Sequence, residues 1–411
     1  MFINENTWHY IRQHADGDVR KLALQGVKDT EVDLQQALQQ IVGRQTARRK
    51  LPSWALHDDI IYPPHLNMEQ CSSEQTARYK AGLVMGDRGL VMKSGVFVDL
   101  TGGFGVDFYW MSQGFKERIY VEQNEQLCAI STENFRTLGL SCLVCCCDTA
   151  TYLTTQLDHA DVIYLDPARR DEHGGRTYDI ADCSPNVLEL LPQLLQKADR
   201  IILKLSPMLD WRKAVSDLGC VSEVHIISVN NECKELVLVL TPNQSETINL
   251  YCVNNDNVFS IVRCLRTASP TSSDCESDAF GLNARSLLSA DAKFLYEPNA
   301  SIMKAGCFDV LEERYAVQQV AVNSHLFLSA DEIDDFPGRG FQIMAISSMN
   351  KRDLKAALAG IEKANVAVRN FPLSVEQLRK KLKLKDGGDV YIFATTKTNG
   401  EHSLFICRKI G

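Results

Sequence analysis

The chain reads VFVDLTGGFG from Val96 to Gly105, and this stretch predicts how the middle of the protein folds. The apolar residues up to Asp99 have the composition of a buried β-strand, and the residues after Gly105 suit a helix. The glycines between them favour a turn whose backbone lies close to a ligand, or a tight structural turn. Their spacing differs from the G-x-G-x-x-G of dinucleotide sites, so we expect another ligand.

Short apolar runs follow this stretch at βαβ spacing. They are Val96–Leu100, Arg118–Glu122, Cys142–Cys147, Asp161–Leu165 and Arg200–Leu205. Their Val and Ile content suits buried parallel strands, and helix-length segments separate them. Two further runs, Glu223–Val229 and Glu235–Leu240, flank a short polar stretch and predict an antiparallel hairpin. Five parallel strands plus a terminal antiparallel hairpin are the outline of the Rossmann-like class I methyltransferase sheet, an α/β fold.

Acidic residues end the first three predicted strands. Asp99 precedes the turn and suits a ligand with an ammonium group, such as the amino acid tail of S-adenosyl-L-methionine. Glu122 can accept hydrogen bonds from both ribose hydroxyls of a nucleoside. A nicotinamide-dependent enzyme would place an acidic residue at the same position, so Glu122 does not by itself identify the cofactor. Asp148 either accepts from the adenine amino group or is a solvated aspartate. We therefore predict a nucleoside-binding edge that includes Thr101, Gly103 and Gly105 of the turn.

The fourth predicted strand ends in Asp166-Pro167-Ala168-Arg169. Methyltransferases that act on exocyclic amino groups carry Asp or Asn, two prolines and an aromatic residue at this place. A side-chain oxygen and a backbone carbonyl accept the two amino hydrogens there, and positioning supplies most of the catalysis. Asp166 and Pro167 are therefore the catalytic candidates. Ala168 and Arg169 depart from the pattern; Arg169 can stack on a base, bind a phosphate or pair with a carboxylate.

Lys204 lies in the fifth predicted strand, close to its end at the same edge. It can contact a phosphate, hold the Asp166 loop, or emerge toward solvent. The segment Glu232–Glu235 in the predicted hairpin can likewise contribute to the site or be exposed to solvent.

Composition limits the class of protein. The 411 residues are 45% hydrophobic, and no apolar run approaches the roughly 20 residues that span a bilayer. The N-terminus lacks a signal peptide, so we expect a cytoplasmic protein without a membrane partner. A net charge of −8 does not favour nonspecific nucleic-acid binding, and any RNA contact must be local. Two basic runs, Arg44–Lys50 and Arg379–Lys385, are interpreted as solvated helix faces.

The 14 cysteines are expected to be thiols in such a compartment. Cys142 and Cys145 have a metal-like spacing, but no second ligand pair matches it. We therefore predict no metal, and interpret this run as small apolar residues of a buried strand.

The flanking regions differ in character, and we expect three domains. Residues 1–89 are predicted to be helical, with Ser72 and Gln75 forming a capping box. Residues 90–243 form the methyltransferase domain. Residues 244–411 are expected to form a small α+β domain, and Pro242 to about Asp256 is interpreted as a linker with an uncertain strand. Its predicted strands are Phe294–Tyr296, His325–Leu328, Phe341–Ile346, Val366–Arg369, Asp389–Ala394 and Ser403–Arg408, and its helices are Lys351–Lys363 and Ser374–Leu382.

These motifs resemble class I S-adenosylmethionine-dependent methyltransferases that carry a C-terminal THUMP-like domain. The resembling segments are Asp99–Asp107 (DLTGGFGVD), Glu122, Asp166–Asp171 (DPARRD), Lys204–Asp210 (KLSPMLD), Cys71–Ala81 (CSSEQTARYKA) and, for the C-terminal domain, Gly387–Thr395. The resemblance implies S-adenosyl-L-methionine as cofactor and RNA as substrate class. It also implies a helix near Ser72–Gln75 that closes over the cofactor.

The predicted function is methyl transfer to an RNA base, with an exocyclic amino group of guanine or adenine favoured. Arg169 and Lys204 would then bind the base or its phosphates. One alternative is a methyltransferase for a protein or small molecule, which the acidic net charge favours. Another is a module that keeps the fold without catalysis. The oligomeric state is not specified by these motifs.

Overall fold

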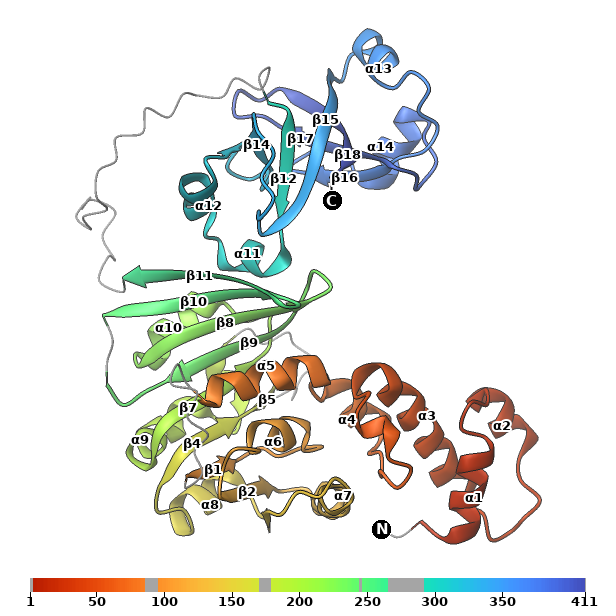
Figure 1. The fold of residues 1–411 in the computed structure, drawn as a ribbon, viewed down its shortest axis with the longest axis vertical. Helices are drawn as coiled ribbons and strands as arrows, with labels where there is room; N and C mark the ends of the chain where they lie inside the picture. Colours follow the sequence, from red (N-terminus) through yellow and green to blue (C-terminus); the bar gives the residue numbers. More distant parts are fainter. Residues whose placement is uncertain (1–2, 86–94, 170–178, 244–245, 265–291, 411) are drawn as a thin grey trace. The chain divides into compact units, whose positions relative to one another are not determined.

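The computed structural model describes residues 3–85, 95–169, 179–243, 246–264 and 292–410 (Figure 1). The chain divides into two compact units. The first comprises residues 1–225 and 235–249, and the second comprises residues 226–234 and 250–411. The division passes through two paired strands, β8 and β9, whose connecting turn belongs to the second unit.

The N-terminal part of the first unit is helical, as predicted. Its helices are α1 (Glu5–Gln13), α2 (Val19–Gln25), α3 (Leu34–Lys50), the 3-10 turn η1 (Trp54–Leu56), α4 (His65–Gln70) and α5 (Glu74–Met85). Asn4, Asp18 and Asp33 cap the first three helices through their side-chain oxygens. The predicted cap of α5 was wrong by one residue: the Ser73 Oγ accepts from the Thr76 amide at 3.2 Å. The Ser72 hydroxyl is instead turned inward, where it binds Asp107.

A mostly parallel sheet forms the centre of the first unit. Its strands are β1 (Val96–Asp99), β2 (Glu117–Glu122), β3 (Leu143–Cys146), β4 (Ala160–Leu165), β7 (Ala198–Leu205), β8 (Val221–Val229) and β9 (Glu232–Leu240). Their spatial order is β8-β9-β7-β4-β1-β2-β3. The strands β1, β2, β3, β4 and β7 pair in parallel, and β9 pairs antiparallel to β7. The predicted class I methyltransferase sheet is therefore confirmed.

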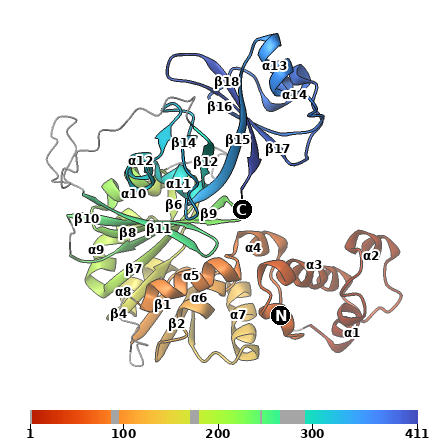
Figure 2. The ribbon, with the colours of Figure 1, turned by 45° about the horizontal axis from the view of Figure 1, so that its top comes forward.

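Helices connect the parallel strands. They are α6 (Val106–Met111), α7 (Glu125–Thr137), α8 (Thr149–Thr155), α9 (Val187–Lys197) and α10 (Trp211–Leu218). Figure 2 shows α5 beside α6, whereas α9 contacts α8, α10 and β7. After β4 the chain adds a short antiparallel pair that the sequence did not predict, β5 (Ala168–Arg169) with β6 (Cys183–Ser184). The 3-10 turn η2 (Ile180–Asp182) directly precedes β6.

The strand β3 differs from its prediction as a buried strand. It is the last strand of the sheet order, and Leu143 in it is 57% exposed. An edge strand has a neighbour on one side only, so its side chains are less covered than those of β1 or β4. Cys145 and Cys146 are accordingly half-buried and exposed.

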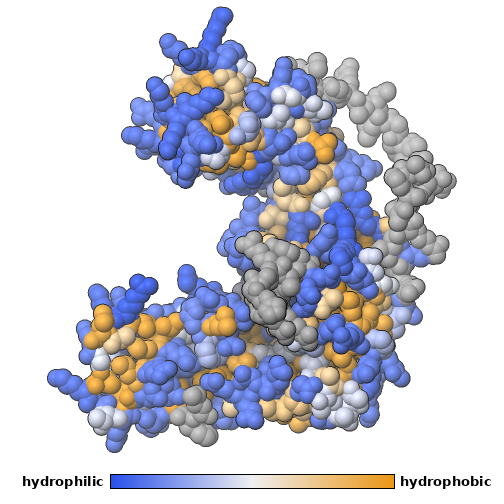
Figure 3. Space-filling model, turned by 180° about the vertical axis from the view of Figure 1, so that it is seen from behind, coloured by the Kyte–Doolittle hydropathy of each residue, from blue (hydrophilic) through white to orange (hydrophobic). Residues whose placement is uncertain are grey.

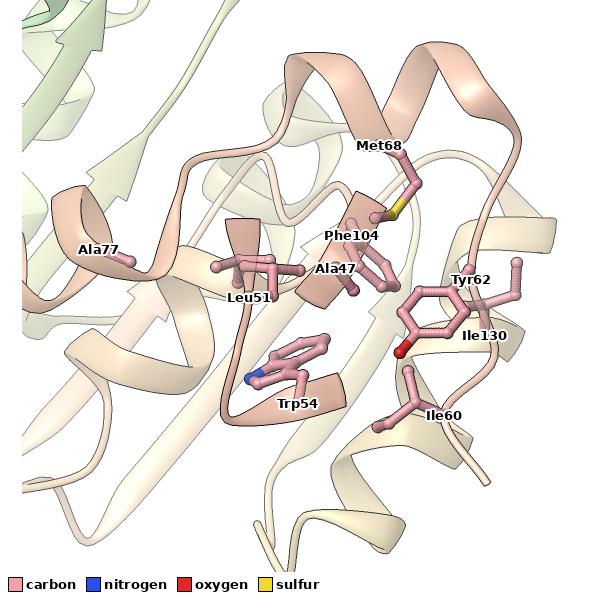
Figure 4. Packing of buried hydrophobic residues seen from close by; sticks show 10 residues of the cluster. Ala47, Leu51, Trp54, Ile60, Tyr62, Met68, Ala77, Phe104 and Ile130 are labelled. Atoms are coloured by element: carbon pink, nitrogen blue, oxygen red, sulfur yellow. The ribbon is translucent and has the colours of Figure 1, made fainter. Parts of the chain in front are cut away.

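One hydrophobic cluster joins the N-terminal helices to the glycine-rich turn (Figure 4). Trp54 and Phe104 are both buried, and their rings meet edge to face with centroids 5.2 Å apart. The Tyr62 ring is also near Phe104, with centroids 6.4 Å apart, and Ile130 of α7 belongs to the same cluster. The helical region therefore packs on the turn that follows β1.

Two neighbouring strands, β10 (Thr247–Asn254) and β11 (Asn257–Cys264), are joined by a two-residue turn and precede a separate sheet of the second unit. The uncertain strand of the predicted linker is thus present as β10, which occupies most of the segment that was interpreted as linker. The separate sheet has the order β13-β14-β12-β15-β18-β17-β16. Its strands are β12 (Phe294–Pro298), β13 (Gln318–Gln319), β14 (Phe327–Ser329), β15 (Gly338–Ser348), β16 (Asn365–Arg369), β17 (Val390–Thr396) and β18 (His402–Lys409).

Four helices accompany this sheet: α11 (Ala300–Ala305), α12 (Phe308–Tyr315), α13 (Lys351–Ala357) and α14 (Val375–Leu382). The six predicted strands are present, and Ser374 caps α14 with Gln377 in a capping box. The prediction for α13 was too long, because Gly360 with φ +77° ends the helical path after Ala357. Leucines of α13 and α14 pack together on the sheet around Ile392.

Hydrophobic side chains also gather on part of the surface, over the N-terminal helices in Figure 3. Leu24 in α2 is 88% exposed. None of the helices in the described ranges is both long and apolar enough to cross a membrane.

Candidate functional site

The carboxyl ends of β1 and β4 are adjacent and hydrogen-bonded to each other. These strands pair directly, with Asp99 opposite Tyr164. Beyond the strand ends, the Thr101 hydroxyl accepts from the Asp166 amide at 2.6 Å. The glycine-rich turn and the Asp166-Pro167 segment, which the sequence predicted as separate parts of one site, therefore form one edge.

The turn itself is shaped by glycines and by the rings beneath it. Gly103 and Gly105 have φ values of +55° and +82°, which disfavour any other residue. A Cβ on Gly105 would lie 2.6 Å from the Phe135 ring, and one on Gly102 would lie 2.1 Å from the Tyr120 ring. The Tyr120 hydroxyl also donates to the Gly103 carbonyl. At Gly102 and Gly105 the backbone thus lies directly on the rings of Tyr120 and Phe135.

Glu122, at the end of β2, contacts this turn from the next strand. Its Oε2 accepts from the Gly103 amide and its Oε1 from the Asn124 amide, both at 2.8 Å. Each carboxylate oxygen has two lone pairs, so both can still accept from a vicinal diol. The predicted ribose-binding position is therefore held in place by two backbone donors.

Asp99 is almost completely buried, with 1% of its surface exposed. Its Oδ1 accepts from the Thr101 amide at 2.9 Å. Burial raises its pKa well above the ordinary range, the Thr101 amide opposes this, and the neighbouring carboxyls Asp107, Asp166 and Glu122 raise the pKa further. A cationic group placed beside Asp99 would offset the repulsion from the neighbouring carboxyls and favour the ionised carboxylate, so the predicted ammonium contact is chemically reasonable here.

Asp148, at the end of β3, has a structural task of its own. It is exposed and caps α8: Oδ1 accepts from the Thr151 amide at 2.9 Å, and Oδ2 from the Thr151 hydroxyl at 2.5 Å. The Thr151 hydrogen bonds lower its pKa, so it is an ionised acceptor. Its predicted contact with adenine stays a prediction, since capping alone explains this residue.

Asp166 is paired with Lys204, which is one of the three roles that the sequence left open for this lysine. The Lys204 ammonium donates to Asp166 Oδ2 at 2.5 Å and lies 3.9 Å from Asp107 Oδ2. Burial lowers the pKa of Lys204, but Asp166, Glu235 and Asp107 together raise it above its ordinary value. The pKa of Asp166 is raised by burial despite this partner. One carboxylate oxygen of Asp166 is thus committed to Lys204, and Oδ1 remains for another donor.

A buried ion network lies directly behind this pair, and the sequence reasoning did not assign it. Lys80 of α5 has no exposed surface. Its ammonium donates to Glu235 Oε2 at 2.6 Å and Ser72 Oγ at 2.7 Å, and contacts Asp107 at 2.9 Å. Burial raises the pKa of Asp107, but Lys80 and Lys204 outweigh it and hold the pKa below its usual value.

Further hydroxyls complete the network. The Tyr164 hydroxyl donates to Asp107 at 2.6 Å, and the Thr76 hydroxyl donates to Glu235 at 2.8 Å. The two lysines therefore tie α5, α6 and the strands β4, β7 and β9 together beneath the site. Lys80 and Asp107 do lie in the quoted segments CSSEQTARYKA and DLTGGFGVD, and a lysine inside an otherwise apolar helix face was the available signal.

The contacts described above do not include the side chains of two predicted site residues, Pro167 and Arg169. Pro167 is buried beside Asp166, and the backbone of Arg169 lies in β5, but the side chain of Arg169 lies outside the described part. In the part of the chain that the structure describes, no group of three or more His, Cys, Asp or Glu residues could hold a metal ion.

Comparisons with known proteins agree with this architecture. A family model described as "THUMP domain-like" matches residues 338–409, and one described as "ferredoxin-like domain" matches residues 294–337. No curated protein sequence matches the chain. A solved structure of a "putative methyltransferase" from Porphyromonas gingivalis W83 is 28% identical, covers 100% of both chains and has a TM-score of 0.83.

More distant structures cover only part of the chain. A "putative class I S-adenosylmethionine-dependent methyltransferase" from Listeria monocytogenes is 10% identical, with a TM-score of 0.39 over 62% of this chain and 94% of that one. A "putative RNA methyltransferase" from Pyrococcus horikoshii is 17% identical, with a TM-score of 0.32 over 44% and 90%. The strand order and the full-length match give the chain a class I methyltransferase fold followed by a THUMP-like domain.

Proposed function

We propose that this protein is an S-adenosyl-L-methionine-dependent methyltransferase that modifies an RNA base, with an exocyclic amino group of guanine or adenine as the acceptor. The observation that carries the proposal is the hydrogen bond between Thr101 and the Asp166 amide. It joins the turn that suits the cofactor to the carboxylate that suits the acceptor, on one edge of the sheet. A class I fold with a THUMP-like domain supports the same assignment.

The cofactor would supply an electrophilic methyl group, and the residues at this edge would hold and orient it. Asp99 would accept from its ammonium group, and Glu122 would accept from its ribose hydroxyls. At Gly103 the nearest atom to a Cβ would be the Thr101 carbonyl oxygen at 3.8 Å, which leaves space for the cofactor chain beside the turn. The hydrogen bonds from Asp99 and Glu122 to the cofactor would be charge-assisted and would contribute about 1.5–3 kcal/mol each.

Asp166 would orient the acceptor and would not act as a nucleophile. Its Oδ2 is held by Lys204, so Oδ1 and the Pro167 backbone carbonyl would accept the two amino hydrogens. This directs the nitrogen lone pair toward the methyl group, and in-line positioning supplies most of the catalysis. Lys204 is thus a positioning residue, with a predicted second contact to a phosphate.

Cofactor binding is tested by calorimetric titration with S-adenosylhomocysteine. Glu122→Ala is expected to weaken binding at least tenfold, because two hydroxyl contacts are lost. Glu117→Ala is the matched control, since Glu117 is exposed at the opposite end of β2. Equal affinity of wild type and Glu122→Ala would refute the cofactor site.

Methyl transfer is tested with radiolabelled S-adenosylmethionine and RNA from cells that lack the protein. Asp166→Ala is expected to reduce incorporation about hundredfold while S-adenosylhomocysteine affinity persists. Label in a protein or metabolite fraction would favour the alternative substrate class, which the net charge of −8 suits. Cofactor binding without transfer to any fraction would favour a noncatalytic module. The cytoplasmic location stays a prediction, tested by fractionation.

A further inference from the structure

Two cysteine thiols lie next to Glu122 at the edge of the first unit's sheet. Cys128 is in the first turn of α7, and its Sγ donates to the Glu122 backbone carbonyl at 3.1 Å. Cys146 is the last residue of β3 and lies directly opposite Glu122 in the parallel pairing of β2 with β3. The two thiols are also hydrogen-bonded to each other. A helix and a strand thus bring two cysteines together beside the predicted ribose-binding residue.

The two thiols differ in their access to solvent. Cys128 is buried, with 6% of its surface exposed, whereas Cys146 is exposed. Burial, and then the neighbouring Cys146, raise the pKa of Cys128 to about 12, so Cys128 stays protonated and does not react with solutes by itself. Cys146 is therefore the thiol that a dissolved oxidant meets first, and Cys128 is its buried partner.

The position of β3 in the sheet allows these two sulfurs to approach each other. A covalent bond between them requires a shorter separation than a thiol hydrogen bond does. The strand β3 is the last in the sheet order and has β2 as its one neighbour, and Cys146 ends it. A small shift at the end of an edge strand disturbs few backbone hydrogen bonds, so the sheet opposes the approach only weakly.

We propose that Cys128 and Cys146 are a site of reversible oxidation by hydrogen peroxide, and that their disulfide weakens cofactor binding at Glu122. As a regulation of the cofactor site, this rests on the proposed function. The disulfide consumes the thiol that donates to the Glu122 carbonyl. It also ties α7 to β3, and Asn124, which caps α7, donates its backbone amide to the Glu122 carboxylate. A movement of α7 is therefore transmitted to the ribose-binding carboxylate.

The oxidation uses one peroxide for each disulfide. The Cys146 thiolate attacks a peroxide oxygen, the O–O bond breaks with release of hydroxide, and a sulfenic acid forms. Loss of the negative charge on Cys146 then favours deprotonation of Cys128. The Cys128 thiolate attacks the sulfenic sulfur and displaces a second hydroxide, which forms the S–S bond. The two thiol protons convert both hydroxides to water, and a dithiol such as dithiothreitol reverses the oxidation by exchange.

Peptide mapping tests the modification itself. The reduced full chain is treated with hydrogen peroxide, alkylated and digested with trypsin, and the products are identified by mass spectrometry. Cleavage separates residues 119–136, which contain Cys128, from residues 137–169, which contain Cys146. We expect a cross-link between these two peptides in wild type and in Cys147→Ser, the matched control at the next position. The cross-link should be absent from Cys146→Ser; its persistence there, or its absence from wild type, would overturn the proposed pairing.

A second pair of thiols provides a control within the same molecule. Cys252 in β10 and Cys307, which precedes α12, are also hydrogen-bonded to each other, and neither has exposed surface. Because a dissolved oxidant does not reach these thiols, they should remain reduced while Cys128 and Cys146 are oxidised. Earlier oxidation of the Cys252 pair would contradict the argument that access to Cys146 selects the site.

Calorimetric titration with S-adenosylhomocysteine tests the effect on the cofactor site. Oxidised wild type is expected to bind about fivefold more weakly than the reduced protein, because a hydrogen bond that holds Glu122 is lost. Dithiothreitol should restore the affinity, and Cys146→Ser should bind equally well before and after peroxide treatment. Equal affinity of reduced and oxidised wild type, with the disulfide present in the peptide map, would refute the regulation of cofactor binding.

The two proposals fail separately, because peptide mapping needs no cofactor. If reduced wild type binds S-adenosylhomocysteine but forms no disulfide between Cys128 and Cys146, the oxidation site is wrong and the cofactor assignment stands. If the disulfide forms but reduced wild type does not bind S-adenosylhomocysteine, the cofactor assignment and its regulation are wrong and the oxidation site stands.

Discussion

The buried Lys80 makes a strong prediction about how the first unit is held together. Lys80→Met keeps the length and apolar character of the side chain and removes the ammonium. Asp107 and Glu235 then stay buried without their closest cation. Lys80 joins α5 to α6 and β9, and on β9 only the Thr76 hydroxyl bond to Glu235 among the described contacts would remain, so the substitution removes an ion pair and weakens the tie between helix and sheet.

The expected loss can be derived from these contacts. Removing one partner of a buried ion pair costs about 3–5 kcal/mol, since an uncompensated charge remains. Lys204 lies 3.9 Å from Asp107 and compensates part of this, so we expect about 3 kcal/mol. For a unit of this size each kcal/mol lowers the melting temperature by about 2–4 °C, which gives a decrease of roughly 6–12 °C.

Differential scanning calorimetry at several pH values measures this decrease. Asp107 has a folded pKa below its ordinary value, so its stabilisation exists above the unfolded pKa and is lost as pH falls through the folded pKa. The difference between wild type and Lys80→Met should therefore shrink as the pH falls below about 4. The double variant Lys80→Met, Glu235→Gln should recover part of the loss at neutral pH.

Lys116→Met is the control, because Lys116 is exposed in the same unit. A decrease for Lys80→Met that is no larger than the control's, or that is independent of pH, would refute the argument that this network stabilises the unit.

Three further predictions concern single residues. The pKa of Asp99 in the folded protein is raised, so its carboxylate destabilises the ligand-free protein as the pH rises through that value. Asp99→Asn should therefore have a higher melting temperature than wild type at pH 8 and an equal one near pH 4. The same variant should bind S-adenosylhomocysteine at least tenfold more weakly. A lower melting temperature at pH 8 would contradict this. Burial lowers the pKa of His225, so the stability of the protein should fall as the pH drops below about 6.5. His225→Gln should flatten this part of a plot of melting temperature against pH, and an unchanged slope would contradict the prediction. Gly105→Ala combines a φ of +82° with a clash against Phe135, whereas Gly139→Ala has φ +70° and open space. In urea titrations the first should cost about 1–3 kcal/mol more than the second, and equal losses would show that the Phe135 contact yields.

The strand pattern was predictable because buried parallel strands are continuous apolar runs with acidic residues at their ends. Asp99, Glu122 and Asp166 could be assigned to one edge, since parallel strands share a carboxyl edge. The same reasoning was wrong for Cys145, because an apolar run does not reveal whether its strand is central or at the edge. It was incomplete for β10, whose alternating pattern suits a strand with one covered face but was interpreted as a linker with an uncertain strand.

The sequence by itself determined the class I methyltransferase sheet, the glycine-rich turn and the residue types at its edge, because these depend on local periodicity and on the spacing of strand ends. Only the tertiary structure decided which side chains neutralise one another. Lys80 and Glu235 are 155 positions apart, and Glu297 and Arg369 are 72 apart. No local pattern specifies such pairs, because charged groups acquire their partners and their pKa shifts only when folding removes them from water.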